Sequence, residues 1–487
     1  MTQTEALTIL KAGRNVFVTG AAGSGKTYLV NQYIRYLRDH NVPIGITAST
    51  GIAATHMGGV TIHSWSGIGI SDNLSDFEID GIVEKKHIQK KLEAAKVLII
   101  DEVSMLHHFR LDMVDRVLRK VKKSKEPFGG LQVVLCGDFF QLPPIARFGE
   151  PQSKFIYASE SWKAGKFTVC YLGENYRQVN DPSLDILNDI RAGEISEQSY
   201  ELLMSRKVEN LRRSTAEDQE DVESISTKLY THNIDVDSIN SAALIKMDGY
   251  EAAYEMTMKG KKPLVEALKK SCLAPEVLKL KVGARVICVK NNFEKGYVNG
   301  TLGVVVSCGY GTDPVIHTAP TPDHPDGRRL SIEKTNWTIE DSGKVLAELV
   351  QYPLRLAWAI TVHKSQGMSL DSVEVDLSKS FEPGMGYVAL SRVRTLVGLK
   401  ILGLNSNALR VNPDVLEYDR HLRELSAKAE SVVQYTDAEE IEKQQKEFLA
   451  SAAPLHAMKP KKEPEYRFPK TTKEKKKKKW GSWKKKY

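Results

Sequence analysis

The chain has 487 residues, of which 41% are hydrophobic and 27% are charged, a composition typical of a globular protein with roughly two to four domains. No apolar run approaches the roughly 18 residues of a transmembrane helix, and the first residues lack the apolar segment of a signal peptide, so we expect no membrane partner. The five cysteines are scattered and form no C-x-x-C pair. This pattern predicts a reducing compartment and argues against a structural zinc site.

The formal net charge of +8 is concentrated near the C-terminal end. Residues 459–487 contain 14 Lys and Arg against 3 Asp and Glu, so the rest of the chain carries a net charge of −3. We expect residues 452–487 to form a basic, disordered tail. Lysines interleaved with Trp480 and Trp483 favour a non-specific nucleic-acid arm; a nuclear-localisation-like run and a solvated extension are the alternatives. We expect a cytoplasmic, nucleoid-associated protein in a bacterium or phage, with the nucleus as the alternative.

A phosphate-binding loop lies near the start of the chain. The apolar run 16–18 predicts a buried strand, and an amphipathic helix is expected to begin near Lys26. Between them stands GAAGSGKT, in which glycines let backbone N–H groups point at phosphate oxygens beside a helix N-terminus. Lys26 would bind the β- and γ-phosphates of ATP, and the Thr27 hydroxyl would complete the shell of a Mg²⁺ ion. The loop residues expected at the nucleotide are Gly20, Ala21, Ala22, Gly23, Ser24, Gly25, Lys26 and Thr27.

Three further apolar runs end in polar residues, namely 44–46, 97–100 and 131–136. They alternate with helical patterns, which predicts a parallel sheet covered on both faces, with ligands at the carboxyl ends of its strands. Asp101 and Glu102 follow the second run; Asp101 would hold Mg²⁺, and Glu102 would polarise the attacking water. In isolation an Asp-Glu pair more often begins a solvated helix. The apolar strand before this pair favours the catalytic interpretation.

Phosphoryl transfer also needs a group that orients water and positive charge on the γ-phosphate. Gln141 follows the third apolar run in the segment GDFFQLPP, whose prolines exclude a helix directly after it. We expect Gln141 to orient water or to sense the γ-phosphate. Arg177, in LGENYRQ, and Arg392, in YVALSR, are the candidate cations, although a single arginine is more often a surface residue.

The second half of the chain changes in character. Residues 277–352 contain short β-rich runs, an Asn-Gly turn signal and a proline-rich loop, which predict a small β-barrel inserted into a second domain. Residues 66–90 form a short excursion from the first domain. We therefore predict a first domain over 1–168, a second domain over 169–276 and 353–430, the inserted barrel over 277–352, and a charged helical extension over 431–451.

The sequence contains, in this order, GAAGSGKT, TASTGIAA, GGVTIHSWSGIG, VLIIDEVSML, CGDFFQLPPI, LGENYRQ, RLAWAITVHKSQGMSLDSVEVDL and GYVALSR. Their order and spacing resemble the PIF (petite integration frequency) family of DNA helicases, in superfamily 1, group B, beside RecD and Dda. The resemblance extends from about residue 1 to residue 425. The HKSQG and YVALSR blocks are specific to this group.

The resemblance implies an α/β fold with two RecA-like domains, ATP in the cleft between them, and translocation along single-stranded DNA in the 5′→3′ direction. Arg177 and Arg392 would reach ATP from the second domain. Gln366 and Gly367, in the HKSQG block, would link the nucleotide state to the DNA track. Gln3 would recognise adenine upstream of the phosphate loop.

By the same resemblance, several side chains would contact DNA, and Trp65 would either stack on a base or lie in the core. The 66–90 excursion occupies the family's place for a strand-separating pin. The inserted β-rich domain matches a Src-homology-three-type barrel. The implied DNA contacts are Thr50 and His63 in the first domain and Asn233, His363 and Lys364 in the second.

We therefore predict a DNA helicase that uses ATP and Mg²⁺, binds single-stranded and forked duplex DNA, acts as a monomer and works with replication or repair proteins. The sequence does not choose among forks, G-quadruplexes and RNA–DNA hybrids as substrates. Alternatives are a small-molecule kinase or DNA-independent ATPase, an inactive ATP-bound clamp, and a RecD-like motor subunit of a nuclease complex. The presence of Glu102 and Gln141 argues against the clamp.

Overall fold

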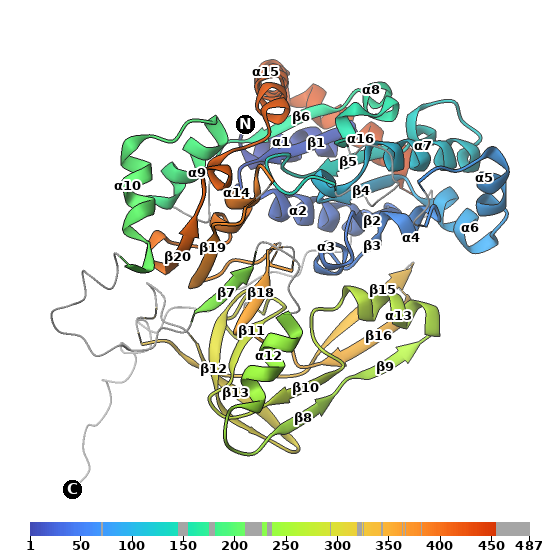
Figure 1. The fold of residues 1–487 in the computed structure, drawn as a ribbon. Coiled ribbons are helices and arrows are strands. Elements are labelled where there is room, and N and C mark those ends of the chain that lie inside the picture. Colours follow the sequence, from blue (N-terminus) through green and yellow to red (C-terminus); the bar gives the residue numbers. More distant parts are fainter. Residues whose placement is uncertain are drawn as a thin grey trace, which may run out of the picture.

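A parallel sheet of six strands forms the first part of the protein (Figure 1). The computed structural model describes residues 1–69, 72–144, 154–174, 181–209, 226–230, 236–292, 294–318, 324, 326–341, 344–362, 364–365, 367–380 and 382–453. Neighbouring strands of the sheet pair in parallel throughout, which confirms the parallel sheet expected from the apolar runs. Its strands, in spatial order, are β3 (Val60–Thr61), β2 (Ile44–Ala48), β4 (Val97–Asp101), β5 (Gln132–Cys136), β1 (Val16–Gly20) and β6 (Thr168–Leu172).

Side chains that alternate along these strands belong to two separate cores. Val16 and Val18 pack with the first two helices of the chain, whereas Phe17 packs with helices that follow β4 and β5. Because successive side chains of a strand point to opposite faces, the sheet is covered on both sides. The helices of the first face are α1 (Gln3–Lys11) and α2 (Lys26–Asp39), and those of the second include α4 (Ile62–Ser66), α7 (His108–Lys122) and α8 (Glu160–Gly165).

The described residues of the 66–90 excursion are largely helical. It contains α5 (Asp76–Val83) and continues into α6 (Lys86–Ala94), and both pack against α7. Ion pairs of Lys120 with Asp80 at 2.8 Å and of Arg116 with Asp76 at 2.9 Å join α5 to α7. Residues 70 and 71 lie outside the described residues.

A second parallel sheet has the strand order β18-β7-β19-β20. Its buried side chains and those on one face of the first sheet belong to one continuous hydrophobic core. The two sheets therefore meet through packed helices and loops. The elements of this part are α9 (Ser183–Ala192), α10 (Glu197–Ser205), β7 (Thr227–Tyr230), β18 (Ala359–Thr361), β19 (Val373–Leu377), α14 (Met385–Leu390) and β20 (Leu399–Leu404).

A β-rich part lies below the first sheet in Figure 1 and is inserted in the sequence between β7 and β18, which are neighbours in the second sheet. Its strands begin at Ala252, before the expected start at residue 277. All its strand pairs in the described residues are antiparallel. The elements are α12 (Val236–Ile245), β8 (Ala252–Glu255), β9 (Thr257–Gly260), α13 (Lys262–Ser271), β10 (Val277–Leu280), β11 (Arg285–Cys288), β12 (Leu302–Gly309), β13 (Thr312–Thr318), β14 (Arg329–Ser331), β15 (Thr335–Asp341), β16 (Lys344–Gln351) and β17 (Leu354–Leu356).

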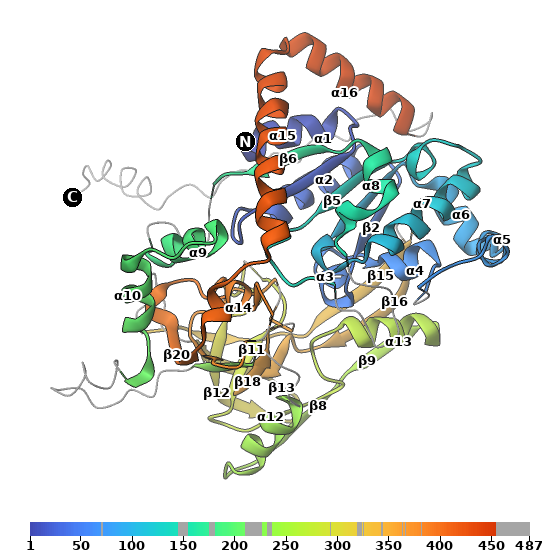
Figure 2. The same cartoon turned by 45° about the horizontal axis from the view of Figure 1, so that its top comes forward.

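The last two helices return to the first sheet (Figure 2). Helix α15 (Pro413–Tyr435) packs along β6, where the Tyr171 N–H donates to Ser426 Oγ at 3.0 Å. Helix α16 (Ala438–Ala452) packs against α1. Much of α15 therefore lies against the first sheet, although residues 353–430 were expected in the second domain. Among the described helices, none is long and apolar enough to cross a membrane.

Candidate ATP site at the seam between the two sheets

The phosphate loop joins β1 to α2 through backbone conformations that favour glycine. Gly20 has φ 142°, and a Cβ there would lie 2.7 Å from the Leu172 carbonyl oxygen and 2.8 Å from Ser24 Oγ. Gly23 and Gly25 have φ values of 87° and 81°. Because these left-handed values are strained for residues with a Cβ, glycine allows the chain to turn sharply before α2 begins at Lys26.

Lys26 closes the loop on itself. Its ammonium donates to the carbonyl oxygens of Gly20 at 2.8 Å and of Ala21 at 2.9 Å. Burial lowers the pKa of Lys26, while the nearby Asp138 carboxylate acts in the opposite direction. Among the described residues, the buried Ser24 Oγ has no hydrogen-bond partner. Loop donors and α2 thus form a compact electropositive site.

Two of the remaining predicted ligands lie at the edges of this loop. Thr27 is exposed in the first turn of α2. Gln3 in α1 donates from Nε2 to the Ser24 carbonyl oxygen at 3.4 Å, so its side chain lies beside the loop.

Asp101 and Glu102 stand at the carboxyl end of β4. The Glu102 N–H donates to Asp101 Oδ1 at 2.8 Å, and Ser49 Oγ donates to the Glu102 carbonyl oxygen at 2.6 Å. Burial raises the pKa of Asp101, against the influence of Cys136, the Glu102 N–H and Lys26. Glu102 has φ 52° and ψ 44°, a left-handed conformation that is uncommon for a residue with a side chain. Such strain is often found at functional sites.

Arg392 approaches Asp101 and Glu102 from the side of the second sheet. Its side chain is 2% exposed, and Nη2 donates to Gln141 Oε1 across the seam at 3.4 Å. Nε donates to the Val388 carbonyl oxygen at 3.0 Å, which fixes the guanidinium against α14. Burial lowers the pKa of Arg392, and Glu102 is the first of the groups that act against it. The structure therefore brings Gln141 and Arg392 together with Glu102 nearby.

Three further residues at the seam were not identified from the sequence. The Arg191 Nη1 donates to Asp138 Oδ1 and Oδ2, both at 2.7 Å, and to Tyr387 Oη at 3.0 Å. The Ala22 N–H of the phosphate loop donates to the same hydroxyl at 3.0 Å. Asp138 and Tyr387 stand inside conspicuous blocks, CGDFFQLPPI and GYVALSR. Arg191 lies in an ordinary amphipathic helix, where no sequence signal distinguishes it.

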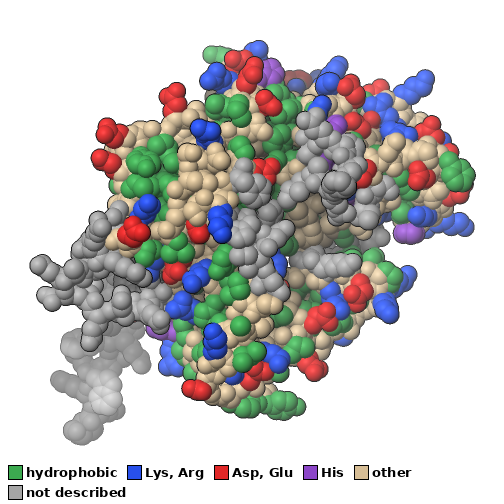
Figure 3. Space-filling model, viewed as in Figure 1, with side chains coloured by type: hydrophobic (Ala, Val, Ile, Leu, Met, Phe, Trp, Pro, Cys, Tyr) green, Lys and Arg blue, Asp and Glu red, His purple; other side chains and the backbone are tan. Residues whose placement is uncertain are grey.

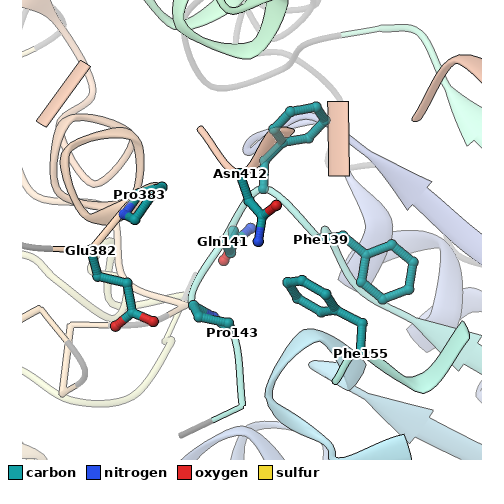
Figure 4. Close-up of a pocket in the computed structure, with 9 residues that line it drawn as sticks. Phe139, Gln141, Pro143, Phe155, Glu382, Pro383 and Asn412 are labelled. Atoms are coloured by element: carbon teal, nitrogen blue, oxygen red, sulfur yellow. The ribbon is translucent and has the colours of Figure 1, made fainter. Parts of the chain in front are cut away.

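A small cavity lies beside Gln141 (Figure 4). Its volume is about 50 Å³, which is room for ordered water and not for a nucleotide. Residues after β5 form one side, and residues before α14 and α15 form the other; burial raises the pKa of Glu382 among them. The labelled lining residues are Phe139, Gln141, Pro143, Phe155, Glu382, Pro383 and Asn412.

The predicted DNA contacts differ in their surroundings. Thr50 begins α3 (Gly51–His56) and accepts at its side chain from the Ala53 N–H at 3.3 Å. Burial, with Arg110 and His107 nearby, lowers the pKa of His63 to about 4. Lys364 forms an ion pair with Asp237 of α12 at 3.1 Å.

Trp65 is a core residue. Its side chain is 4% exposed, and a Cβ on Gly45 of β2 would lie 2.4 Å from its ring, so the indole packs closely against the first sheet. A side chain buried to this extent offers no open ring face for stacking on a base. Gly367 has φ 75°. The other predicted site residues, Arg177, Asn233, His363 and Gln366, lie outside the described residues.

Comparison with known proteins identifies relatives over most of the chain. The family model "PIF1-like helicase" matches residues 3–200, and "DNA helicase Pif1, 2B domain" matches residues 263–308. The ATP-dependent DNA helicase Pif1 of Psychrobacter sp. is 41% identical over 93% of this chain and 75% of its own length. The ATP-dependent DNA helicase Pif1 of Bdellovibrio bacteriovorus is 35% identical over 85% of this chain and 90% of its own.

Solved structures agree with these relatives. Unliganded Pif1 from Bacteroides sp. has a TM-score of 0.72 at 32% identity, over 86% of this chain and 96% of that one. Bacteroides sp. Pif1 in complex with ADP-AlF4 gives 0.69 at 31% identity, over 87% and 96%. Bacteroides Pif1 bound to ssDNA gives 0.55 at 31% identity, over 87% and 96%. The resemblance inferred from the sequence blocks is thereby confirmed, and the chain belongs to the PIF1-like family of ATP-dependent DNA helicases.

Proposed function

We propose that the protein is an ATP-dependent DNA helicase that moves 5′→3′ on single-stranded DNA and separates duplex DNA ahead of it. One observation carries the proposal beyond family membership: Arg392 from the second sheet meets Gln141 from the first, at 3.4 Å, beside the phosphate loop. A hydrolysis site that needs groups from both parts is complete only when they are together. Turnover can therefore drive a relative movement of the two parts along a DNA strand.

The residues at the carboxyl ends of the first sheet's strands form one wall of the site, and they would bind and activate ATP. Lys26 would exchange its two loop carbonyl partners for the β- and γ-phosphate oxygens. Glu102 would polarise the attacking water, and Gln141 would orient it. The left-handed backbone of Glu102 supports this role, since strained residues persist where a side chain must be aimed at a reacting group. Gln3 would recognise adenine from α1.

The residues at the ends of β4 and the phosphate loop fit a Mg²⁺ ion. This ion prefers oxygen ligands and keeps several of its waters, so one hydroxyl and one carboxylate from the protein are sufficient. Thr27 and Asp101 offer these two groups. The burial that raises the pKa of Asp101 would be opposed by a cation beside it, which favours the carboxylate form. When bound, the ion supplies neutralisation of phosphate charge.

The second wall would stabilise the transition state. Arg392 would place its guanidinium on the γ-phosphate, where negative charge is redistributed as the terminal bond breaks. Arg177 is proposed as a second cation from the same side. Gln366 and Gly367 would pass the nucleotide state to the DNA track.

The DNA strand would cross the recess between the upper part of the molecule and the β-rich part below it, which is visible in Figure 3. Bacteroides Pif1 has been solved bound to ssDNA, and a further similar structure concerns DNA unwinding at forked dsDNA by two coordinating Pif1 helicases; both support DNA as the partner here. Hydroxyl, imidazole and ammonium groups position phosphates without reading sequence. The proposed contacts are Thr50, His63, Asn233, His363 and Lys364.

The remaining parts would shape the DNA path. We propose the 66–90 segment as the place of the strand-separating pin. The β-rich part would act as a Src-homology-three-type barrel beside the DNA, which the match of residues 263–308 to the Pif1 2B domain supports. The protein would act as a monomer.

Unwinding of paired substrates, one with only a 5′ single-stranded tail and one with only a 3′ tail, tests the proposal. We expect ATP-dependent unwinding of the 5′-tailed substrate alone, and none with Lys26→Ala. Preference for the 3′ tail would contradict the direction. Hydrolysis that single-stranded DNA does not stimulate would favour a DNA-independent ATPase. Unwinding that requires an added partner chain would favour a RecD-like subunit.

A further inference from the structure

The hydroxyl of Tyr387 touches the phosphate loop from the opposite side of the seam. Tyr387 lies in α14, is 0% exposed and accepts a hydrogen bond from the Ala22 N–H at 3.0 Å. Ala22 belongs to the loop whose N–H groups are phosphate donors. A side chain of the second part therefore holds one of the backbone groups that shape the nucleotide site.

The same hydroxyl is held in place by a buried ion pair. Tyr387 Oη donates to Asp138 Oδ2 at 3.2 Å and accepts from Arg191 Nη1 at 3.0 Å. The side chains of Arg191 and Asp138 are 4% and 1% exposed. Because a buried charge is costly without its partner, these groups keep a fixed arrangement. The direction of the Tyr387 hydroxyl is fixed with them.

Packing limits the remaining freedom of Arg191. Its Cζ lies 4.1 Å from the Phe140 ring centroid, which belongs to the first part, and 5.5 Å from that of Tyr387. Its Nη2 donates to Tyr171 Oη on β6 at 2.7 Å. The guanidinium is thus placed between aromatic rings of both parts. When the two parts are together as in this structure, the network is a buried link across the seam and not a surface ion pair.

Tyr387 and Arg392 belong to one short stretch of chain. The Arg392 N–H donates to the Ala389 carbonyl oxygen at 3.2 Å, and the Arg392 Nε donates to the Val388 carbonyl oxygen at 3.0 Å. These two contacts hold the guanidinium in a fixed position relative to the backbone of α14. Fixing Tyr387 against Ala22 therefore fixes the distance from Arg392 to the phosphate loop. An error of about 1 Å in such a distance can cost up to about a hundredfold in rate.

We propose that Tyr387 is a positioning residue for ATP hydrolysis. Its hydroxyl, held by the Asp138–Arg191 pair, sets the register between the phosphate loop and the arginine-bearing segment after α14. This inference rests on the proposed function, because it assigns Tyr387 to the same hydrolysis site. Tyr387 contacts only one of the phosphate-loop groups that would donate hydrogen bonds to ATP. Its hydroxyl should therefore affect the rate of the chemical step more than the affinity for ATP.

Tyr387→Phe tests the inference, because it removes only the hydroxyl and keeps the ring against Arg191. In the full-length protein with single-stranded DNA, we expect kcat for ATP hydrolysis to fall about tenfold. KM for ATP, and the Kd of a non-hydrolysable ATP analogue, should stay within about twofold. Arg191→Lys, which keeps the charge but loses the planar fork, should show the same separation of kcat from KM.

Tyr33→Phe is the matched control. Tyr33 in α2 is also fully buried, and its hydroxyl donates to Gln132 Oε1 at 2.7 Å, so its loss lowers Tm without touching the seam. We expect wild-type kcat from this variant. Equal losses of kcat in both tyrosine variants would overturn the inference, since they would report stability alone.

Other outcomes also decide against it. An unchanged kcat in Tyr387→Phe, with or without a change in ATP affinity, would mean that the hydroxyl only competes with or assists phosphate binding. A wild-type protein without DNA-stimulated hydrolysis would overturn the proposed function and this inference with it. An active wild type matched by Tyr387→Phe would overturn this inference alone.

Discussion

The nucleotide wall and the proposed DNA face are built in different ways. At the nucleotide wall, backbone turns and buried groups fix each side chain, as in the seam contact between Arg392 and Gln141. On the DNA face, Lys364 is one-third exposed and already bound to Asp237, and Thr50 already caps a helix. Apart from Lys26, which would exchange its two loop carbonyl partners for phosphate oxygens, the first region is organised before its ligand arrives, whereas DNA would have to replace existing partners. Substitutions should therefore have large effects on turnover at the first region and small, salt-dependent effects at the second.

The largest effect is expected from Arg392→Lys. Lysine keeps the charge but loses the planar fork that reaches the seam, so transition-state charge is no longer neutralised. We expect kcat for DNA-stimulated ATP hydrolysis to fall by about 10³, the lower end for a lost arginine finger, with ATP binding retained. Steady-state hydrolysis and equilibrium binding of an ATP analogue measure the two quantities.

The control for this variant is Arg119→Lys. Arg119 in α7 pairs with Asp115 of the same helix at 2.7 Å, so the same chemical change occurs outside the groups that meet at the seam. Hydrolysis by Arg392→Lys within tenfold of wild type would remove Arg392 from the catalytic wall and weaken the contrast between the two regions.

The sequence was sufficient for the elements whose signal is local. The loop GAAGSGKT and the apolar strand before Asp101 predict a parallel sheet with a nucleotide site at its edge because glycine spacing and strand hydrophobicity act over a few residues. The cross-seam partner of Gln141 came only from resemblance. Its 3.4 Å contact with Arg392 joins residues 251 positions apart, a relation that periodicity does not contain.

The residues that were missed depend on tertiary packing. Arg191 looks like any basic residue of an amphipathic helix, and only the fold buries it against Asp138. Trp65 shows the reverse case, since an aromatic residue in a block expected to contact DNA lies against Gly45 in the core. Burial is decided by elements far apart in sequence, and a single sequence does not specify which of them meet.

An intermediate effect is expected at His63. Burial, with Arg110 and His107 nearby, lowers its pKa to about 4, whereas the unfolded chain has about 6.5. Between these values the unfolded state binds a proton that the folded state does not, so the free energy of unfolding falls as the pH falls. We expect His63→Gln to reduce this loss by about 2 kcal/mol between pH 7 and pH 5. Urea unfolding at the two pH values measures it.

The exposed His87 on α6 supplies the comparison for that experiment. His87→Gln should lose as much stability on acidification as the wild type does. If His63→Gln and the wild type lose equal stability on acidification, protonation of the His63 imidazole costs the folded state no free energy. His63 would then behave like an exposed histidine.

The smallest effect, on the affinity for single-stranded DNA, is expected at Lys364. A substitution of its ion-pair partner should change this affinity in the opposite direction. Lys364→Ala should weaken binding of single-stranded DNA by about threefold to tenfold and reduce the salt slope by about 0.7, the value for one lost phosphate contact. Asp237→Asn should act in the opposite direction, because it frees the ammonium from its 3.1 Å partner for a phosphate.

Lys279→Ala, which removes a lysine paired with Glu251 at 3.0 Å in the β-rich part, is the control for charge alone. Fluorescence anisotropy over a salt series measures all three. A lysine that contacts a phosphate must contribute more to DNA affinity than one that only contributes net charge. If Lys364→Ala and Lys279→Ala weaken DNA binding equally, Lys364 makes no specific phosphate contact.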